Sequence, residues 1–318
     1  MGFKVVGLSN ATMDMSFQID SFPILPSQHQ FVEKRLITAG GMANTFFCGA
    51  RLGLHMKAIG HIGGDDLGKI WQAQVSAEGV EVGRQVVFPD RPTTISVALV
   101  DADGQHLFIG HRGDMKMAPD GFPDSWREAI QAADALMIYG WTYLSMGAEA
   151  NLIGIDVAKE AGVPIFFDPG PEIPHMPPEW LEAMYAGSTV VMLTEDEAKQ
   201  SLPAGLSQAE MAQHILKMGP ELVILKLGGQ GIIGYTAAET HYEPGIPVEV
   251  VDLTGAGDCV AAAVIRSYLD NHPLAKLLAL ANGTGAACVK KFGAGQNVPT
   301  LAEIEAVLKQ AGSGYAFE

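Results

Sequence analysis

The sequence predicts an α/β fold in which helices cover both faces of a mainly parallel sheet. Short, nearly continuous apolar runs of the kind that form fully buried strands alternate with stretches of helical periodicity. No low-complexity linker and no internal repeat interrupts this alternation. With 318 residues and 48% hydrophobic content the chain can bury a large core, and its length permits one large domain or two smaller ones.

The predicted elements of the main sheet follow in chain order. We expect strands at the apolar runs 3–8, 57–62, 135–139, 163–167, 189–193 and 222–227. Helical periodicity marks the stretches 67–78, 147–161 and 208–218 between them. A further β-like segment, 248–251, precedes a glycine-rich turn and the small apolar run 259–265, which we expect to be helical.

Two segments break the alternation and predict a small β lid over the site. Segment 13–38 is punctuated by proline and has no clear helical pattern. Segment 85–112 is typical of a meander, because the β-like run 93–100 is followed by a turn at 101–104 and the apolar run 106–109. Lid strands of this kind expose an edge that a homodimer would cover.

Charge and cysteine content argue against several partners and compartments. The 20 basic and 36 acidic side chains give a formal net charge of −16, and such a surface repels nucleic acid and anionic membranes. No apolar run approaches the roughly 20 residues of a membrane span. Cys48, Cys259 and Cys288 lie far apart in small-residue or apolar surroundings, as expected for buried thiols in a reducing compartment. We therefore expect a cytoplasmic protein without nucleic-acid or membrane partners.

The most informative stretch is Asp252-Leu253-Thr254-Gly255-Ala256-Gly257-Asp258. A tight turn here leaves backbone N–H groups unpaired at the positive end of the following helix, which favours an anion. A carboxylate base such as Asp258 beside an anion site suits transfer of a phosphoryl group onto a hydroxyl. The alternative is an ordinary tight turn in which Asp258 only begins the helix.

Two further glycine motifs precede this turn. In Ala39-Gly40-Gly41-Met42-Ala43-Asn44-Thr45 the glycine pair lets backbone approach a ligand, and Asn44 can both donate to and accept from a polyol. The competing interpretation is a glycine loop before an ordinary core helix. In the motif 60–68, the adjacent carboxylates of Asp65 and Asp66 favour helix capping over metal binding.

Two other features have competing interpretations. The stretch 229–234 matches G-x-G-x-x-G, the only support for an NAD-dependent oxidoreductase, but the residues that follow are β-like and predict a hairpin turn. At the end of the lid segment, His111 and Arg112 would either contact an anionic or polyhydroxyl substrate or form a solvated rim. No histidine pair has metal-ligand spacing.

Taken in order, these motifs resemble those of the ribokinase-like carbohydrate kinases of the phosphofructokinase-B type. The resemblance rests on Gly40-Gly41-x-x-Asn44, Gly60-x-x-Gly63-x-Asp65-x-x-Gly68 and Asp252-x-Thr254-Gly255-Ala256-Gly257-Asp258, and it spans nearly the whole chain. It implies a single kinase domain over residues 1–318, with a three-layer α/β/α core and a small β lid. It also implies an ATP-dependent kinase that phosphorylates a primary hydroxyl of a sugar or nucleoside.

The resemblance assigns roles on the acceptor side of the site. Asp258 would be the general base, and the backbone amides of Gly255, Ala256 and Gly257 would form the anion hole. The residues that would hold the acceptor are Asp14, Gly40, Gly41 and Asn44, with Arg112 of the lid rim as a further candidate.

The nucleotide side follows the family pattern less closely. Thr194-Glu195-Asp196-Glu197 stands where the family has Asn-x-x-Glu, so Glu197 would organise Mg²⁺ through water while Thr194 replaces the asparagine. The residues that would line the nucleotide are Thr194, Lys226, Gly228, Gly231 and Asn282. A monovalent-cation site for K⁺ would combine Asp252 and Thr254 with backbone carbonyls around Lys291, Gly293 and Asn297.

The identity of the acceptor stays open at this point. The lid residues do not choose among ribose, fructose, a keto-acid sugar and a nucleoside. A non-catalytic sensor of sugars or nucleotides on the same fold is the alternative from another class of protein.

Overall fold

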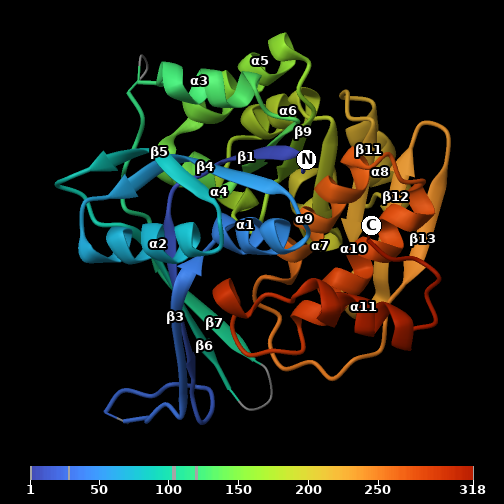
Figure 1. Cartoon of the computed structure of the whole chain (residues 1–318). Helices are drawn as coiled ribbons and strands as arrows, with labels where there is room; N and C mark the ends of the chain where they lie inside the picture. Colours follow the sequence, from blue (N-terminus) through green and yellow to red (C-terminus); the bar gives the residue numbers. More distant parts are fainter. Residues whose placement is uncertain (1, 28, 102–104, 119–120, 318) are drawn as a thin grey trace.

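The computed structural model describes residues 2–27, 29–101, 105–118 and 121–317, which form two sheets (Figure 1). The large sheet has the order β13-β12-β11-β10-β9-β8-β1-β4-β5, and every neighbouring pair from β11 to β5 is parallel. Its strands are β1 (Lys4–Leu8), β4 (His55–Gly63), β5 (Glu81–Phe88), β8 (Ala135–Tyr139), β9 (Ile165–Asp168), β10 (Val190–Thr194), β11 (Leu222–Lys226), β12 (Gly231–Thr236) and β13 (Thr240–Pro244).

Helices cover both faces of the large sheet and make three layers. On one face, the core combines residues of α1 (Met42–Arg51), α2 (Asp66–Ala77), α9 (Ala256–Leu269), α10 (Leu274–Cys288) and α11 (Leu301–Gln310). On the other face, it combines residues of α3 (Asp124–Gln131), α4 (Trp141–Met146), α5 (Ala148–Ala161), α6 (Pro178–Gly187), α7 (Glu195–Ser201) and α8 (Gln208–Leu216). The three-layer α/β/α core that the resemblance implied is therefore confirmed. Among the described residues, no helix is long and apolar enough to cross a membrane.

A second, four-stranded sheet projects from one side of the large one (Figure 1). Its order is β3 (Lys34–Gly40), β2 (Thr12–Gln18), β6 (Thr94–Val100) and β7 (His106–His111). This small sheet comes from the two segments predicted to form the lid. The second of those segments was drawn too long, because residues 85–88 belong to β5 and pair with β4 of the large sheet. Most of the predicted turn, 102–104, lies outside the described residues.

Each of the six apolar runs predicted as main-sheet strands overlaps a strand of the large sheet, whereas the β-like segment 248–251 was predicted wrongly. Val250 and Val251 are 57% and 41% exposed and belong to no strand. The chain has left β13 by this point, and the Val251 N–H donates to the carbonyl of Val289 just after α10. β-branched composition favours a strand only where a neighbouring strand offers hydrogen-bond partners.

The predicted hairpin at 229–234 is confirmed. β11 and β12 pair in antiparallel fashion, and a 3₁₀ turn, Gly228–Gln230, connects them. A dinucleotide fingerprint would instead open a helix after the strand. The observation that suggested an oxidoreductase is thus a turn between two strands.

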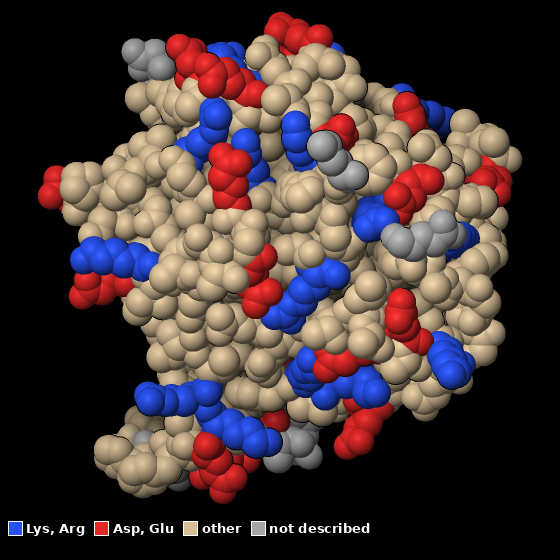
Figure 2. All heavy atoms as spheres, viewed as in Figure 1, with Lys and Arg blue, Asp and Glu red and all other residues tan. Residues whose placement is uncertain are grey.

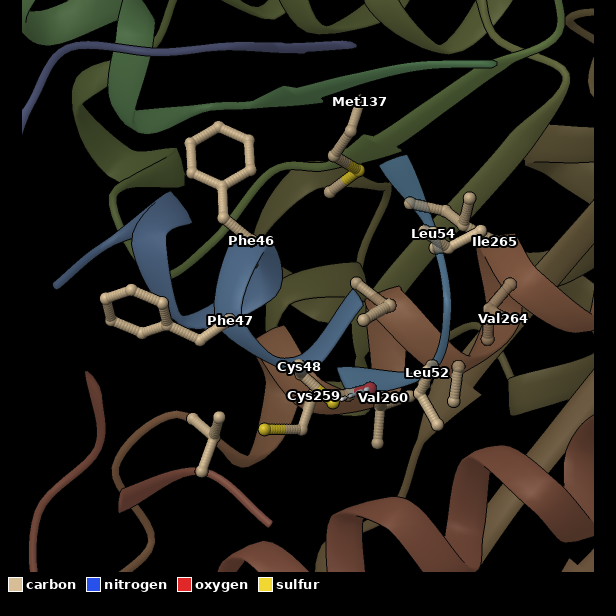
Figure 3. Close-up of a cluster of buried hydrophobic side chains, with 14 of the residues drawn as sticks. Phe46, Phe47, Cys48, Leu52, Leu54, Met137, Cys259, Val260, Val264 and Ile265 are labelled. Atoms are coloured by element: carbon tan, nitrogen blue, oxygen red, sulfur yellow. Dashed lines mark hydrogen bonds between the residues drawn. The ribbon is translucent and has the colours of Figure 1, made fainter. Parts of the chain in front are cut away.

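The packing of α1 against α9 brings two of the glycine motifs together. Figure 3 shows Phe47 and Cys48 of α1 beside Cys259 and Val260 of α9, in the core of one sheet face. The Cys48 thiol donates to the Cys259 carbonyl over 3.8 Å, and both cysteines are buried, as expected from their surroundings. Because each helix begins only a few residues earlier, this contact places the two helix N-termini side by side.

Candidate active site

The glycine-rich turn before α9 leaves free amides at the helix start. Gly255 adopts φ +79°, and a Cβ there would lie 2.7 Å from the Ala294 Cβ, so the position requires glycine. Within the part of the chain that the structure describes, the amides of Gly255 and Gly257 donate no hydrogen bond. The Ala256 amide, predicted to share in the anion hole, instead donates to the Leu253 carbonyl over 3.3 Å. Two of the three predicted donors are therefore available to an anion in this conformation.

The carboxylate of Asp258 accepts a hydrogen bond at each oxygen. Asn44 Nδ2 donates to Oδ2 over 2.7 Å, and the Tyr139 hydroxyl donates to Oδ1 over 2.6 Å. Burial raises the pKa of Asp258, while these two hydrogen bonds and the nearby Lys226 ammonium act in the opposite direction. Sequence reasoning missed Tyr139, since nothing in an apolar strand distinguishes one tyrosine from a core residue.

Asp14 faces the same space from the small sheet. It lies on β2 opposite the Gly40 end of β3, and a Cβ at residue 40 would overlap the Asp14 carboxylate. Gly41, at φ +55°, then starts α1, so this glycine pair lets the helix and the carboxylate approach each other. Burial and the negative charge of Asp258 raise the pKa of Asp14 to about 7. The predicted acceptor residues Asp14, Gly40, Gly41 and Asn44 thus lie together.

A row of polar residues lies along the carboxyl ends of neighbouring parallel strands. Tyr139 pairs in register with Asp168 on β8 and β9, and Thr194 pairs with Lys226 on β10 and β11. In open parallel sheets ligands bind at this edge. The Lys226 ammonium lies 2.6 Å from Asp168 Oδ2, and a Cβ added to Gly257 would be 3.4 Å from the Lys226 Nζ. The row therefore approaches the helix start that carries Asp258.

Asp168 is a second residue that sequence reasoning missed. Burial raises its pKa to about 6, although Lys226 lowers it, and the Lys226 pKa is raised in turn because the acidic neighbours outweigh burial. The only available signal was an acid directly after the apolar run 163–167, and such an acid usually marks the end of a strand.

Thr194 and Glu197 form the N-terminal cap of α7. The Thr194 hydroxyl accepts from the Glu197 amide, and Glu197 Oε2 accepts from the Thr194 amide over 2.6 Å. This capping box occupies one carboxylate oxygen of a side chain that is 8% exposed. Among the described residues, no group of three or more His, Cys, Asp or Glu side chains could hold a metal ion. Because Mg²⁺ keeps several waters and substrate oxygens, one or two carboxylates such as Glu197 and the neighbouring Asp168 still fit it.

The loop predicted to bind K⁺ is folded around Asp252. Its Oδ1 accepts from the Thr254 amide and hydroxyl, and its Oδ2 accepts from the Gly293 amide. In the described ranges Asp252 has no ion-pair partner, although it is only 6% exposed. The Lys291 side chain binds Glu303 instead. A bound cation would neutralise such a buried carboxylate, so this loop is compatible with the predicted K⁺ site.

Two predicted ligand-binding residues have protein partners here. The Arg112 guanidinium lies 3.5 Å from Glu172, in the loop after β9, so it links the end of the small sheet to the core. Asn282 of α10 donates to the Pro244 carbonyl over 2.8 Å. Gly228 begins the 3₁₀ turn between β11 and β12, and Gly231 directly follows this turn as the first residue of β12.

Asp65, by contrast, has the structural role that the sequence predicted. It caps α2 by accepting from the Gly68 amide over 2.9 Å, and it also accepts from the amide and hydroxyl of Thr93, just before strand β6 of the small sheet. These hydrogen bonds hold the pKa of Asp65 below its usual value, although burial opposes them.

The fold is that of the ribokinases. The structure of Arabidopsis thaliana ribokinase complexed with ribose and ATP superimposes with a TM-score of 0.81 at 24% identity, covering 97% of this chain and 99% of that one. The nucleoside kinase of Methanocaldococcus jannaschii gives a TM-score of 0.77 at 18% identity, covering 98% of this chain and 100% of that one.

The sequence comparisons name the family. The profile described as "pfkB family carbohydrate kinase" matches residues 4–301, so the chain belongs to this family and is a phosphotransferase with an alcohol group as acceptor. An ATP-dependent ribose-1-phosphate kinase of Halopiger xanaduensis is 25% identical over 308 residues, which cover 96% of this chain and 98% of that protein. A ribokinase of Arabidopsis thaliana is 27% identical over 318 residues, covering 96% and 79%.

Proposed function

We propose that this protein is an ATP-dependent kinase that transfers the γ-phosphoryl group to a primary hydroxyl of a sugar or sugar-like molecule. The observation that carries the proposal is the Asp258 carboxylate, which lies at the start of α9 beside the free Gly255 and Gly257 amides. A base beside an anion site would serve the two ends of one displacement reaction, because the base takes the hydroxyl proton and the anion site holds the transferred phosphoryl group.

In the proposed step the acceptor hydroxyl gives its proton to Asp258 while its oxygen attacks the γ-phosphorus. The bond from phosphorus to the β–γ bridging oxygen breaks, and ADP leaves. The Gly255 and Gly257 amides would stabilise the charge on the transferred group, and the Ala256 amide joins them if its long contact with Leu253 opens. The raised pKa of Asp258 makes it a stronger base than an exposed aspartate.

The acceptor would lie between the two sheets. Asp14 and the Gly40-Gly41 backbone would bind hydroxyls remote from the reacting one, and Asn44 would exchange its bond with Asp258 for one with the acceptor. Arg112 would reach an acceptor only by leaving Glu172.

The nucleotide would lie across the carboxyl edge of the large sheet. Lys226 would offer charge to its phosphates, with Thr194 nearby, while Gly228 and Gly231 would line the nucleotide and Asn282 would lie near the adenine. Solved structures of this fold include a Cryptococcus neoformans ribokinase with ADP and a provisionally assigned Escherichia coli ribokinase II with ATP and Mg²⁺. Mg²⁺, held by nucleotide phosphates and Glu197 through water, would supply neutralising charge at the phosphates. K⁺ near Asp252 would order the anion-hole loop.

Sugars and nucleosides both stay candidates for the acceptor. The names of related proteins include ribokinase, fructokinase and nucleoside kinase. The deciding experiment is a coupled ADP-release screen over sugars, sugar phosphates, sugar acids and nucleosides, with and without K⁺. Phosphorylated product identifies the acceptor class. Ligand-dependent melting shifts without product would indicate a sensor and would reject the proposal.

The base assignment has its own test. Asp258→Asn should lower kcat by about 10²–10⁴-fold, because the group that removes the hydroxyl proton is gone, while ATP binding measured by calorimetry stays close to wild type. Asp65→Asn is the matched control, because it also removes a carboxylate from a glycine motif, but at the N-cap of α2, and it should leave kcat close to wild type. Full activity of Asp258→Asn would reject the assignment.

The oligomeric state and the compartment are also proposals. Large apolar side chains of the small sheet are exposed, among them Ile37, Leu107 and Ile109. A homodimer through this sheet would cover them, and light scattering tests it. Figure 2 shows acidic and basic side chains interspersed on the face that it draws, without a basic patch there for nucleic acid. We propose a cytoplasmic enzyme.

A further inference from the structure

Tyr139 joins the end of a core strand to the carboxylate at the start of α9. It is the last residue of β8 and is 5% exposed. Its hydroxyl donates to Asp258 Oδ1 over 2.6 Å and lies 2.8 Å from the Thr45 hydroxyl. Thr45, on the first turn of α1, also donates to the Asp258 carbonyl over 3.1 Å. The three residues form a closed set of short contacts between β8, α1 and α9.

We propose that Tyr139 is a positioning residue, which holds Asp258 by Oδ1 so that Oδ2 faces the acceptor hydroxyl. The inference rests on the proposed role of Asp258 as the base. Oδ2 is the oxygen that Asn44 binds, on the side of the predicted acceptor residues. An incoming hydroxyl can therefore replace Asn44 at Oδ2 while Tyr139 stays in place at Oδ1.

The surroundings of Tyr139 keep its hydroxyl a donor. Burial, with the negative charges of Asp258 and Asp168, raises the pKa of Tyr139 well above its usual value, so the phenol stays protonated at neutral pH. Because its single proton goes to the carboxylate, Thr45 donates either to the Tyr139 oxygen or to the Asp258 carbonyl. Tyr139 thus takes no proton from the reaction, and its effect passes through Asp258.

A purely structural tyrosine would act differently from a positioning one. The hydrogen bond from Tyr139 lowers the pKa of Asp258, against the effect of burial. Removing it leaves Oδ1 without its donor in a partly buried position, so the pKa of Asp258 must rise. The acid limb of the pH–rate profile must then move to higher pH, which loss of packing alone would not cause.

The test compares Tyr139→Phe with Tyr185→Phe. Tyr185 of α6 is also buried, and among the described residues its hydroxyl makes no hydrogen bond to Asp258, so its replacement removes the same atom without touching the proposed base. For Tyr139→Phe we expect kcat to fall about tenfold or more, as for loss of a hydrogen bond to a charged group, with the KM for ATP unchanged. Its acid limb should move up by about half a pH unit or more. Tyr185→Phe should leave the pH profile unchanged.

A second measurement does not depend on activity. The loss of stability caused by Tyr139→Phe should be larger at pH 8 than at pH 5, because the hydrogen bond is strongest to ionised Asp258. In an Asp258→Asn background this pH dependence should disappear. An unchanged pH–rate profile, or a stability loss equal at both pH values, overturns the inference. Absence of phosphotransfer by the wild-type protein would reject the proposed function, and the stability cycle would still decide the role of Tyr139.

Discussion

Replacing Asp14 by asparagine should stabilise the folded protein at neutral pH. Burial and the charge of Asp258 raise the pKa of Asp14 from 3.8 to about 7. When folding raises the pKa of an acid, the unfolded chain loses the proton at a lower pH than the folded chain does. The free energy of unfolding therefore falls as the pH rises from 3.8 to about 7, and it is constant above that pH. The cost reaches about 4 kcal/mol, which is roughly three pKa units at 1.36 kcal/mol each. Asparagine keeps the shape of the side chain without this cost.

The assay is urea denaturation of the wild type and Asp14→Asn across this pH range, with similar m-values required for comparison. The difference in unfolding free energy should be small near pH 4.5 and grow to as much as about 4 kcal/mol at pH 8. Asp20→Asn, which removes an exposed carboxylate of the adjoining segment, is the control and should show no such trend. A difference independent of pH, or a wild type more stable than Asp14→Asn at pH 8, would refute the reasoning.

The remaining predictions concern the anion-hole turn and the buried ion pair. Gly255→Ala should unfold at a lower temperature and lose phosphotransfer, because the Gly255 φ of +79° and the nearby Ala294 Cβ both oppose a side chain. Gly257→Ala should fold normally, because the added Cβ would meet only the flexible tip of Lys226, at 3.4 Å. Equal melting temperatures of the two variants would contradict this. Lys226→Met should cost roughly 3 kcal/mol in urea denaturation at pH 8, because the buried Asp168 carboxylate loses the ammonium that lowers its pKa. Lys226→Met combined with Asp168→Asn should recover part of this loss, and a double variant no more stable than Lys226→Met would show that the pair is not coupled.

The sequence was sufficient for the inner strands of the main sheet, from β11 to β4, because of how these strands are buried. Runs such as 135–139 are apolar throughout, since helices cover both faces of a parallel sheet, and this pattern belongs to the segment itself. Segment 248–251, Val-Glu-Val-Val, is also rich in β-branched residues but has no strand beside it, and its own sequence does not reveal the missing neighbour. Residues 85–88 likewise join the large sheet by pairing with β4, the preceding strand, from which α2 separates them.

The site residues show the same difference between local and long-range information. The glycine motifs were recognisable because glycine is required locally, as the overlap of a residue-40 Cβ with the Asp14 carboxylate illustrates. Asp168 and Tyr139 were not predicted as site residues, because the partners that place them in the site, Lys226 and Asp258, are 58 and 119 residues away in the sequence. Arg112 was considered for its charge alone, and only the structure shows that Glu172 already binds it. Where the roles of these residues depend on a bound ligand, they stay predictions.

The negative charges of the site carboxylates explain why a nucleotide would bind there together with a divalent cation. The negative charge of Asp258 raises the pKa of Asp14, and the charges of Glu197 and Asp258 raise the pKa of Asp168. Within the described ranges, Lys226 is the one basic side chain that acts on the pKa of Asp168 and Asp258. Because Lys226 offsets only part of this negative charge, the carboxylates would repel free nucleotide phosphates. Proton uptake at Asp14, whose pKa is about 7, relieves part of this repulsion, and a divalent cation on the phosphates would relieve more. Acceptor and nucleotide binding should therefore be coupled through charge, even where the two ligands do not touch.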